Sequence, residues 1–299
     1  MPSIIMKVER VGQTKMLWGE GPAWDARRSR LYCVDTLGAV VLWLDSEADD
    51  LVSTSVPSMV TVAHPTGDLN KLAVSLDDGF HLLDVETGDC QALAGLPAPN
   101  VPRMNDSVVD ARGRIVTGYF FLGSAAGGPP PRGAYWSLGH ERAWTKIDEG
   151  KGNTNGPCFS PDGKVFYVAD SNASAIHAFD YDVETGALSN CRLLMDMKPL
   201  GIPDGCKVDT DGCLWSVMFG SSRLVRITPD GRHDRTVELP TSHVTDLVFA
   251  GSALDVAYVT TVGMELGKIK PEGPLAGGLL RVEGLGVTGL PEHVAQVVG

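Results

Sequence analysis

The chain has 299 residues, which is enough for one large all-β domain or two ordinary domains. Apolar residues make up 43% and charged residues 21%, with 35 glycines and 19 prolines, a composition typical of a compact, turn-rich protein and not of a disordered chain. The net charge of −12 and the pI near 5.0 argue against nucleic acid or an anionic membrane as a partner, because both require a basic face.

The N-terminal segment 1–12 has only a short apolar patch, Ile4 to Met6, before Lys7 and Glu9, so we expect no signal peptide. No apolar run reaches the roughly 18 residues needed to span a bilayer. The six cysteines lack C-x-x-C spacing, which favours reduced, mostly buried thiols over a zinc site or a disulfide framework. We therefore expect a cytoplasmic protein, either a monomer or a small homo-oligomer.

A turn-marked pair of short strands recurs six times along the chain. Repeats of about 40 to 50 residues are typical of four-stranded propeller blades. The pattern therefore predicts an all-β fold, a six-bladed β-propeller that occupies residues 1–299 as a single domain. The copies begin at Trp24, His64, Val109, Phe159, Val208 and Phe249, at start-to-start distances of 40, 45, 50, 49 and 41 residues.

The fourth copy shows the local pattern most clearly. A Pro-Asp-Gly turn at 161–163 leads into an alternating apolar strand over 164–169, and residues 174–180 form its expected partner. We expect this blade to end at the turn over 184–186. No segment keeps a helical apolar period over even about 12 residues, so the chain is expected to contain no helices.

A ring of blades leaves an exposed sheet edge unless its two ends meet. We expect the N-terminal strand over 5–11 to pair into the last blade, which residues 254–282 build. The Gly/Pro-rich stretch over 123–133 is expected to form a loop between strands, and it could overhang the mouth of the central channel.

Four polar segments come just before a repeat and therefore lie at the same end of four different blades. Their Glu, Asn and Asp side chains offer only oxygen ligands, which suit Ca²⁺, Mg²⁺ or Mn²⁺ better than a metal that prefers thiolate or imidazole. The pattern predicts a central metal site. The segments are G-E-G-P (19–22), R-M-N-D (103–106), N-T-N-G-P (153–157) and I-P-D-G (202–205).

Longer stretches around these segments resemble the senescence marker protein (regucalcin)/gluconolactonase/luciferin-regenerating-enzyme-like family. The resemblance covers essentially the full length in the right order. The matching stretches are L-W-G-E-G-P-A-W-D (17–25), R-M-N-D (103–106), N-G-P-C-F-S-P-D-G-K-V-F-Y (155–167), I-P-D-G-C-K-V-D-T-D-G-C-L-W (202–215) and A-G-G-L-L-R-V-E-G-L-G-V-T-G (276–289).

The resemblance implies lactonase activity on a sugar-acid lactone or a related small lactone. It implies one divalent metal ion, Ca²⁺, Mg²⁺, Mn²⁺, Zn²⁺ or Fe²⁺, held by Glu20, Asn155 and Asp204. Arg103 and Asn105 are implied to contact the substrate, and Asp204 to act also as the acid/base residue. Two carboxylates and one amide would leave coordination positions open for substrate and water. Asp204 could then accept the proton of that water.

One departure from the family pattern concerns the substrate. Sugar-lactonase relatives often carry a glutamate after the strand that follows R-x-N-D, where this chain has Y-F-F-L-G (119–123). We therefore expect Tyr119 to contact the substrate in a more apolar pocket. The other expected lining residues are Trp18, Met104, Phe120, Met218 and Phe219.

Two other functions stay open on this evidence. One is a related propeller hydrolase that acts on an apolar lactone or a phosphotriester, which the stretch from Tyr119 favours. The other is a non-catalytic calcium-binding or sensor protein, because propellers host many unrelated functions. No G-x-S-x-G motif is present, so a serine-hydrolase mechanism lacks its signature.

The candidate residues also have structural interpretations. Glu20 and Asp204 could be turn residues, Asn105 and Asn155 could cap turns, and Arg103 could form a loop salt bridge.

Three further polar residues have both a functional and a structural interpretation. Asp106 could orient Asn105 or close its turn. His243 and Asp246 could form an acid/base pair near the sixth blade, although a histidine at a strand edge is more often structural.

Overall fold

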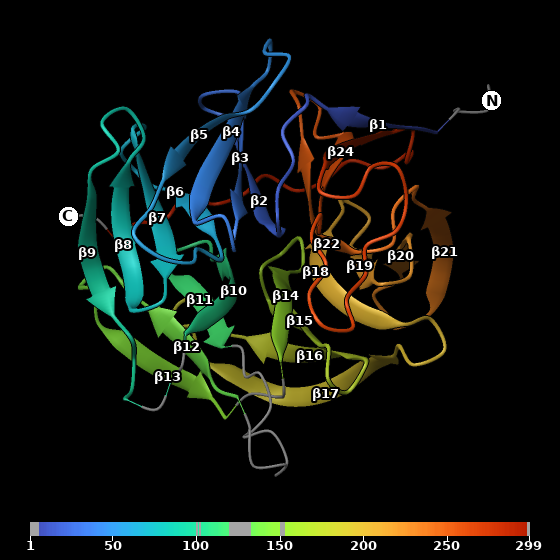
Figure 1. The fold of residues 1–299 in the computed structure, drawn as a ribbon. Coiled ribbons are helices and arrows are strands. Elements are labelled where there is room, and N and C mark those ends of the chain that lie inside the picture. Colours follow the sequence, from blue (N-terminus) through green and yellow to red (C-terminus); the bar gives the residue numbers. More distant parts are fainter. Residues whose placement is uncertain (1–5, 100, 102, 120–132, 150–152, 298–299) are drawn as a thin grey trace.

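The computed structural model describes residues 6–99, 101, 103–119, 133–149 and 153–297. Within these ranges the chain forms six antiparallel four-stranded sheets around a common axis, an all-β six-bladed propeller (Figure 1). None of the described residues lies in an α-helix. The predicted fold class is therefore confirmed.

Each blade runs from an inner strand beside the axis to an outer strand at the rim (Figure 1). Blade 1 consists of β2 (Gly19–Asp25), β3 (Arg30–Asp35), β4 (Val40–Asp45) and β5 (Val52–Ser55), and blade 2 of β6 (Ala63–Pro65), β7 (Lys71–Leu76), β8 (Gly79–Asp84) and β9 (Cys90–Gly95). Blade 3 consists of β10 (Met104–Val109), β11 (Ile115–Tyr119), β12 (Tyr135–Leu138) and β13 (Trp144–Asp148), and blade 4 of β14 (Thr154–Phe159), β15 (Val165–Asp170), β16 (Ala175–Tyr181) and β17 (Leu188–Asp196). Blade 5 consists of β18 (Ile202–Val208), β19 (Leu214–Phe219), β20 (Arg223–Ile227) and β21 (His233–Glu238). Blade 6 consists of β22 (Val244–Ala250), β23 (Val256–Thr261), β24 (Leu279–Glu283) and β1 (Lys7–Val11).

The six predicted repeats all begin in the last residues of an inner strand, which confirms the repeat assignment. In blade 4, β15 and β16 match the two predicted strands. The expected end of this blade at 184–186 was wrong, because that turn leads into a fourth strand, β17. This strand lies at the exposed rim and shows no alternation of buried and exposed residues, so its sequence carries no apolar strand pattern.

The two ends of the chain close the ring, as predicted. β1 pairs antiparallel with β24 over the register from Lys7 opposite Glu283 to Val11 opposite Leu279. An ion pair between Arg281 and Glu9, 3.2 Å apart, adds to this pairing. Closure covers the edge of β24 that would otherwise offer unpaired backbone groups.

The core lies between neighbouring sheets. Trp215 of β19 is fully buried and packs against Phe249 of β22, with ring centroids 6.3 Å apart, so blades 5 and 6 share one apolar cluster. Trp24 of β2 is also buried. All six cysteines are free thiols, and Cys191 alone is exposed.

We call the end of the axis where inner strands begin the upper end, and the end where they finish the lower end. At the lower end, Asp110 and Asp209 follow β10 and β18. Each places one carboxylate oxygen at 2.9–3.0 Å from the backbone N–H groups of the second and fourth residues after it. The second oxygen of Asp209 accepts from Trp215 and Arg226, both at 2.8 Å. These carboxylates therefore hold the first hairpins of blades 3 and 5 in place.

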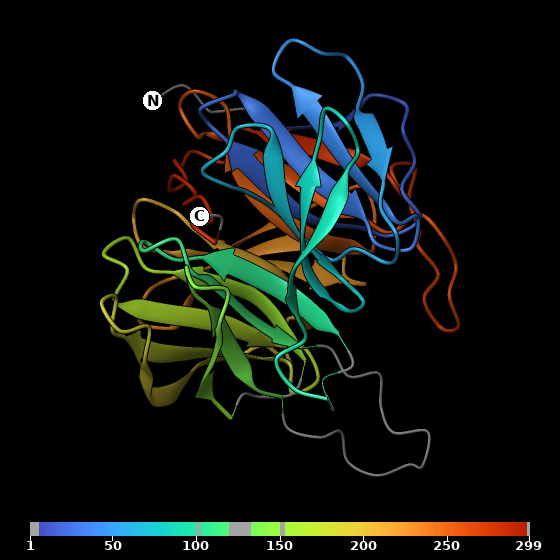
Figure 2. The ribbon, with the colours of Figure 1, turned by 90° about the vertical axis from the view of Figure 1, so that its left-hand side faces the viewer.

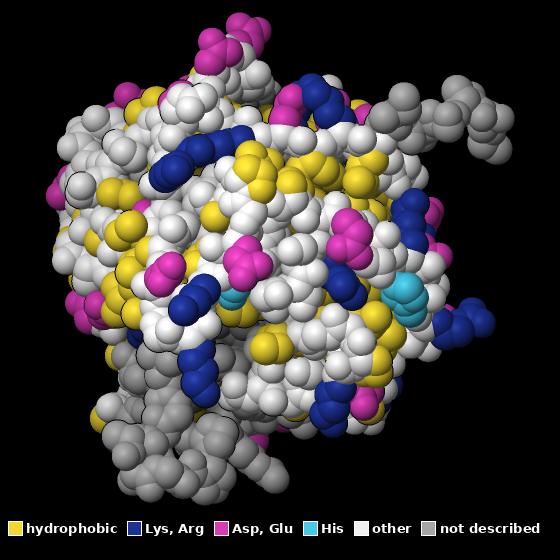
Figure 3. All heavy atoms as spheres, turned by 45° about the vertical axis from the view of Figure 1, so that its right-hand side comes forward, with side chains coloured by type: hydrophobic (Ala, Val, Ile, Leu, Met, Phe, Trp, Pro, Cys, Tyr) yellow, Lys and Arg dark blue, Asp and Glu magenta, His cyan; other side chains and the backbone are white. Residues whose placement is uncertain are grey.

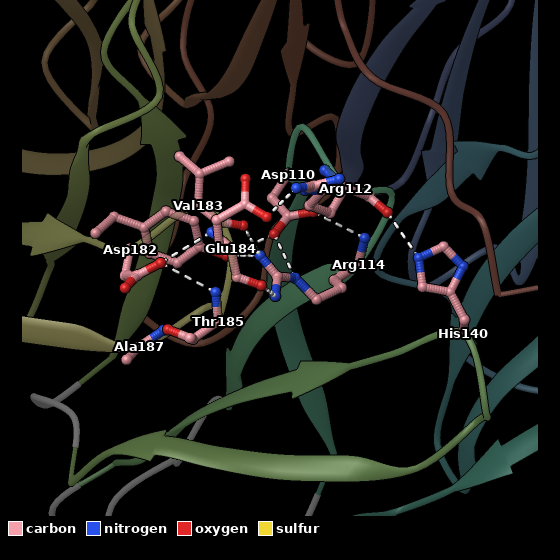
Figure 4. A network of polar contacts seen from close by, with 10 residues as sticks. Asp110, Arg112, Arg114, His140, Asp182, Val183, Glu184, Thr185 and Ala187 are labelled. Atoms are coloured by element: carbon pink, nitrogen blue, oxygen red, sulfur yellow. Dashed lines mark hydrogen bonds and ion pairs between the residues drawn. The ribbon is translucent and has the colours of Figure 1, made fainter.

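Blades 3 and 4 are joined by a related network (Figure 4). Arg114 donates to Asp110 at 2.6 Å and to the carbonyl of Val183 at 2.5 Å, across the blade junction. Tyr181 donates to the same carboxylate at 2.6 Å. An exposed ion pair between Arg112 and Glu184 lies beside it.

The C-terminal segment 288–297, which we call the strap, crosses the lower end (Figure 2). It exchanges hydrogen bonds of 2.7–2.9 Å with blades 5, 6, 1, 2 and 3 in turn, and Ala295 and Val297 are fully buried. The sequence contained no repeat signal for it. The partners in these hydrogen bonds are Thr210, Leu254, Trp24, Pro65 and Gly113.

The surface is mixed in charge. On the face that Figure 3 shows, basic side chains lie among acidic ones and not in one tract. Across the parts of the chain that the structure describes, no helix is long and apolar enough to cross a membrane.

Asp209 is 0% exposed, and its removal leaves four donors without an acceptor. We predict that Asp209→Ala lowers the free energy of unfolding by about 3 kcal/mol or more, measured by urea denaturation. Asp211 is the matched control, because it pairs with the same Arg226 but its side chain is 69% exposed. Asp211→Ala should cost less than about 1 kcal/mol, and equal costs would contradict the argument.

His64 of β6 contacts the Ser107 hydroxyl of β10 at 2.7 Å, and burial lowers the pKa of its imidazole to about 4. In the unfolded chain the imidazole charges near pH 6.5. The unfolded state therefore binds more protons between pH 6.5 and 4, and the stability that the neutral His64 contributes is lost as pH falls through that window.

We predict that His64→Gln weakens the dependence of the unfolding free energy on pH between 6.5 and 4, by up to about 1.4 kcal/mol per pH unit. The measurement is urea denaturation of metal-stripped protein at several pH values. The exposed His233→Gln is the control, which leaves the buried imidazole in place. A wild-type pH profile in His64→Gln would contradict the prediction.

Candidate metal and substrate site

The upper ends of five inner strands share one irregularity. The pairing register shifts after Glu20 in β2, Met104 in β10, Asn155 in β14, Pro203 in β18 and Val244 in β22. Such β-bulges bend a strand and redirect its side chains, and they are frequent beside active sites. β6 pairs with β7 without a shift. The predicted site residues therefore lie in or beside bulged segments.

The sequence predicted that the four polar segments occupy equivalent positions, and this holds to within one residue. Glu20 and Asn155 are the first residues of their bulges, whereas Asn105 and Asp204 are the second. The third position holds Asp106 in β10 and Asp246 in β22.

In β2 and β14 the second position is a glycine with positive φ, 49° at Gly21 and 53° at Gly156. A Cβ on Gly21 would lie 2.8 Å from the Thr61 carbonyl oxygen, and one on Gly156 would lie 2.5 Å from the Cys206 nitrogen. Both positions therefore require glycine, because a neighbouring blade approaches the backbone there.

Hydrogen bonds connect the upper ends of blades 3, 4 and 5. The Asn105 amide donates to Asn155 Oδ1 at 2.6 Å and to the Thr154 carbonyl at 2.7 Å. The Asn155 amide donates to the Ser171 hydroxyl at 2.8 Å, which in turn donates to the Pro203 carbonyl at 2.7 Å. The structure thus brings Asn105 and Asn155 together and ties both to the strand that carries Asp204.

Blade 1 contributes Glu20, which accepts a hydrogen bond from Trp18 Nε1 at 3.3 Å. Burial raises the pKa of Glu20 well above its ordinary value, and the charges of Asp204 and Asp106 raise it further. Burial likewise raises the pKa values of Asp204 and Asp246, and neighbouring carboxylates add to both shifts. These mutual effects place Glu20, Asp106, Asp204 and Asp246 in one group at the axis, which we call the carboxylate cluster.

The donor set fits a divalent cation. Asp204 is 9% exposed, and no group among the described residues donates a hydrogen bond to its carboxylate. A buried carboxylate without donors is costly unless a cation compensates it. His, Cys, Asp and Glu side chains form no metal-binding group of three or more in the described ranges, so a centre here depends on the amide oxygen of Asn155 beside Glu20 and Asp204.

Asp106 and Asp246 are the residues to which sequence reasoning gave too little weight. Asp106 accepts from the backbone N–H groups of Gly156 and Ser107, both at 2.7 Å, and burial raises its pKa to about 6. Asp246 packs against Gly205, where a Cβ would lie 1.9 Å from its Oδ1. Their shared third position in a bulged strand becomes visible only once the strand register is known.

Arg103 and Tyr119 lie at the upper end of blade 3, and both are half-buried. Arg103 Nη1 lies 3.5 Å from the Met59 sulfur, and its guanidinium interacts electrostatically with Asp77 and Glu20. Burial lowers the pKa of Arg103, but an arginine stays charged at physiological pH. Tyr119 ends β11 opposite Met104.

The expected apolar lining holds only in part. Met104 and Met218 are both 0% exposed and belong to core clusters, so they line no pocket. Because side chains alternate between the two faces of a strand, both methionine side chains point between neighbouring blades. Phe120 and residues 123–132 of the expected overhanging loop lie outside the described residues.

Three half-exposed rings form an aromatic wall beside Glu20. Trp18 stacks on Phe219 with ring centroids 5.9 Å apart, and the His243 ring meets Phe219 edge-on at 4.9 Å. His243 Nδ1 contacts the Ser242 hydroxyl at 2.7 Å, whereas Asp246 accepts from the Leu247 N–H. The hydrogen bonds of His243 and Asp246 thus go to different partners.

Comparisons with known proteins identify the family of this chain. The sequence profile described as SMP-30/Gluconolactonase/LRE-like region matches residues 18–263. Regucalcin of Danio rerio is 32% identical over 295 residues, 96% of this chain and 98% of the relative. Pentonolactonase XacC of Haloferax volcanii is 32% identical over 301 residues, 98% and 99% of the two chains.

Among solved structures, a luciferin-regenerating enzyme superposes with a TM-score of 0.89 and 28% identity, over 97% of this chain and 99% of that one. The profile match covers well over half of the chain, and the relatives align along almost the whole length. This chain therefore belongs to the SMP-30/gluconolactonase/LRE-like family.

Proposed function

We propose that this protein is a metal-dependent lactonase that opens a sugar-acid lactone, or a related small lactone, to the hydroxy acid. Membership of a family that includes gluconolactonases, with 32% identity to a pentonolactonase, identifies the chain as a lactone-hydrolysing enzyme. The observation that carries the metal dependence is the carboxylate cluster, in which Asp204 has no hydrogen-bond donor among the described residues.

Glu20, Asn155 and Asp204 would hold one divalent ion. Their oxygen ligands favour Ca²⁺, Mg²⁺ or Mn²⁺, and Zn²⁺ or Fe²⁺ can compete where available. When bound, such an ion polarises a lactone carbonyl and lowers the pKa of a coordinated water. The hydrogen bond from Trp18 orients Glu20, and the 2.6 Å bond from Asn105 orients the oxygen of Asn155.

The residues of the chain account for the proton transfers. Asp204 accepts a proton from the attacking water as the water oxygen bonds to the carbonyl carbon. When the ring C–O bond breaks, the same carboxyl returns the proton to the leaving oxygen, so that the hydroxy acid forms without another reagent. Arg103 offers several N–H donors to substrate hydroxyls or to the product carboxylate.

The substrate contacts favour a small ring with an apolar face. The wall of Trp18, Phe219 and His243 can pack against the C–H face of a sugar ring. Tyr119 ends β11, which pairs with the strand β10 that begins just after Arg103. The same wall would accept an alkyl lactone, so hydrolysis of an apolar lactone is the second candidate. The proposed setting is the cytoplasm, where the six free thiols stay reduced.

The first test is hydrolysis by metal-stripped protein reloaded with Ca²⁺, Mg²⁺, Mn²⁺, Zn²⁺ or Fe²⁺. We expect turnover of aldonolactones with at least one ion and none without metal, measured by acid release. Fast hydrolysis of only alkyl lactones would favour the second candidate. Fast hydrolysis of only a phosphotriester would contradict the lactonase assignment. Tight metal binding without turnover of any lactone would favour a calcium-binding sensor.

Asp204→Asn should lower kcat by at least about 100-fold in the reloaded enzyme, because the amide cannot accept the proton of the water. Asp211→Asn is the control, since Asp211 is an exposed carboxylate at the lower end. If Asp204→Asn retains wild-type kcat, Asp204 is not the acid/base residue.

In metal-free protein the same substitution should stabilise the fold by about 1 kcal/mol, because it removes one of the mutually repelling buried carboxylates. Urea denaturation in the presence of a chelator measures this. With saturating metal the order should reverse, because the wild type gains binding energy that the variant loses. A variant that is less stable than the wild type in both conditions would contradict the charge argument.

A further inference from the structure

A cavity of about 320 Å³ lies at the lower end, opposite the carboxylate cluster. Inner strands and the strap line it together, and its lining residues that can carry charge or a proton include His64, Asp110, Asp162, Lys207, Glu292 and His293. His64 is held neutral by burial, which lowers its pKa to about 4. Asp110 is paired with Arg114, and Lys207 is paired with Glu292.

Lys207 and Glu292 form a shielded ion pair. Lys207 Nζ lies 2.6 Å from Glu292 Oε1, and the two side chains are only 18% and 21% exposed. The other carboxylate oxygen of Glu292 accepts the Trp24 N–H at 2.9 Å. Glu292 belongs to the strap, and the hydrogen bond from Trp24 fixes its carboxylate to blade 1. The other carboxylate oxygen is thereby positioned against Lys207.

Lys207 is also within electrostatic reach of the carboxylate cluster. It follows Asp204 by three residues in β18. Burial opposes its charged form, yet the carboxylates of Glu292, Asp246 and Asp106 hold its pKa above the ordinary value. The ammonium is therefore paired with Glu292 and also interacts electrostatically with two members of the cluster.

We propose that Glu292 of the strap sets the cation affinity of the site at the upper end by cancelling the charge of Lys207. The proposal rests on the proposed function, because it takes Glu20, Asn155 and Asp204 as the cation site. With both residues charged, the pair is nearly neutral toward a cation at the axis. Glu292 acts through Lys207 and is a positioning residue, not a catalytic one.

The signs follow from Coulomb's law in a poorly solvated interior. Without the charge of Glu292, the ammonium of Lys207 is uncancelled and repels a divalent cation. Without the charge of Lys207, Glu292 adds one more negative charge near the site and attracts the cation. With both charges removed, the electrostatic environment returns close to that of the wild type. A purely structural role would give no such reversal of sign.

The experiment measures the dissociation constants of Ca²⁺ and Mn²⁺ by titration calorimetry on metal-stripped, full-length protein. We expect Glu292→Gln to weaken binding about tenfold, because one uncancelled positive charge then repels the divalent cation through a poorly solvated interior. Lys207→Met should tighten binding, and the double variant should lie within about threefold of the wild type. Lys207→Gln serves as the second neutral variant if Lys207→Met does not fold.

Glu184→Gln is the matched control, because it removes the same charge from an exposed ion pair with Arg112 at the same end of the propeller (Figure 4). Its affinity should equal that of the wild type. Folding of every variant is checked by circular dichroism and thermal unfolding.

The possible outcomes separate this inference from the proposed function. If the wild type binds no cation, or if Glu20→Gln does not abolish the binding, the metal site itself is wrong. If the wild type binds the cation but Glu292→Gln and Lys207→Met both match it, or both weaken binding alike, the role of Glu292 is overturned. Opposite signs that cancel in the double variant support it.

Discussion

The close approach of inner strands at the axis is the constraint on which the rest of the structure depends. Gly21, Gly156 and Gly205 each lie so near the next blade that a Cβ would come within 3 Å of its atoms. Each of these glycines lies in a β-bulge, which bends its strand. Polar side chains from separate blades therefore share one small volume, and carboxylates gather there in spite of their mutual repulsion.

Hydrogen bonding distinguishes a structural aspartate at one end of the inner strands from a candidate site aspartate at the other end. Asp209 lies at the lower end and receives four hydrogen bonds, so its charge is satisfied within the protein. Asp204, on the same blade, receives none from the described residues. The same side chain is thus a structural anchor in one place and the proposed base, with lone pairs available, in the other, because only its neighbours differ.

Keeping such a cluster assembled without a cation costs stability, and the fold offsets this cost at a distance. The β1–β24 pairing closes the ring, and the strap links five blades across the lower end. Glu292 of the strap also pairs with Lys207, whose charge interacts with Asp106 and Asp246 of the cluster. The strap therefore both links the blades and pairs with the charge of Lys207. Proteins commonly give up stability at functional sites and recover it elsewhere in the fold.

The sequence by itself determined the six repeats, the closing strand and the polar segments of the candidate site, because turn residues and alternating apolar positions are local signals. It could not reveal β17, whose exposed rim position leaves no apolar pattern, or the burial of Met104 and Met218. Only the tertiary structure decided which residue of each bulge meets the axis, and so added Asp246 to the cluster. It alone paired Lys207 with Glu292, because residues 85 positions apart share no local pattern and meet only when the chain closes.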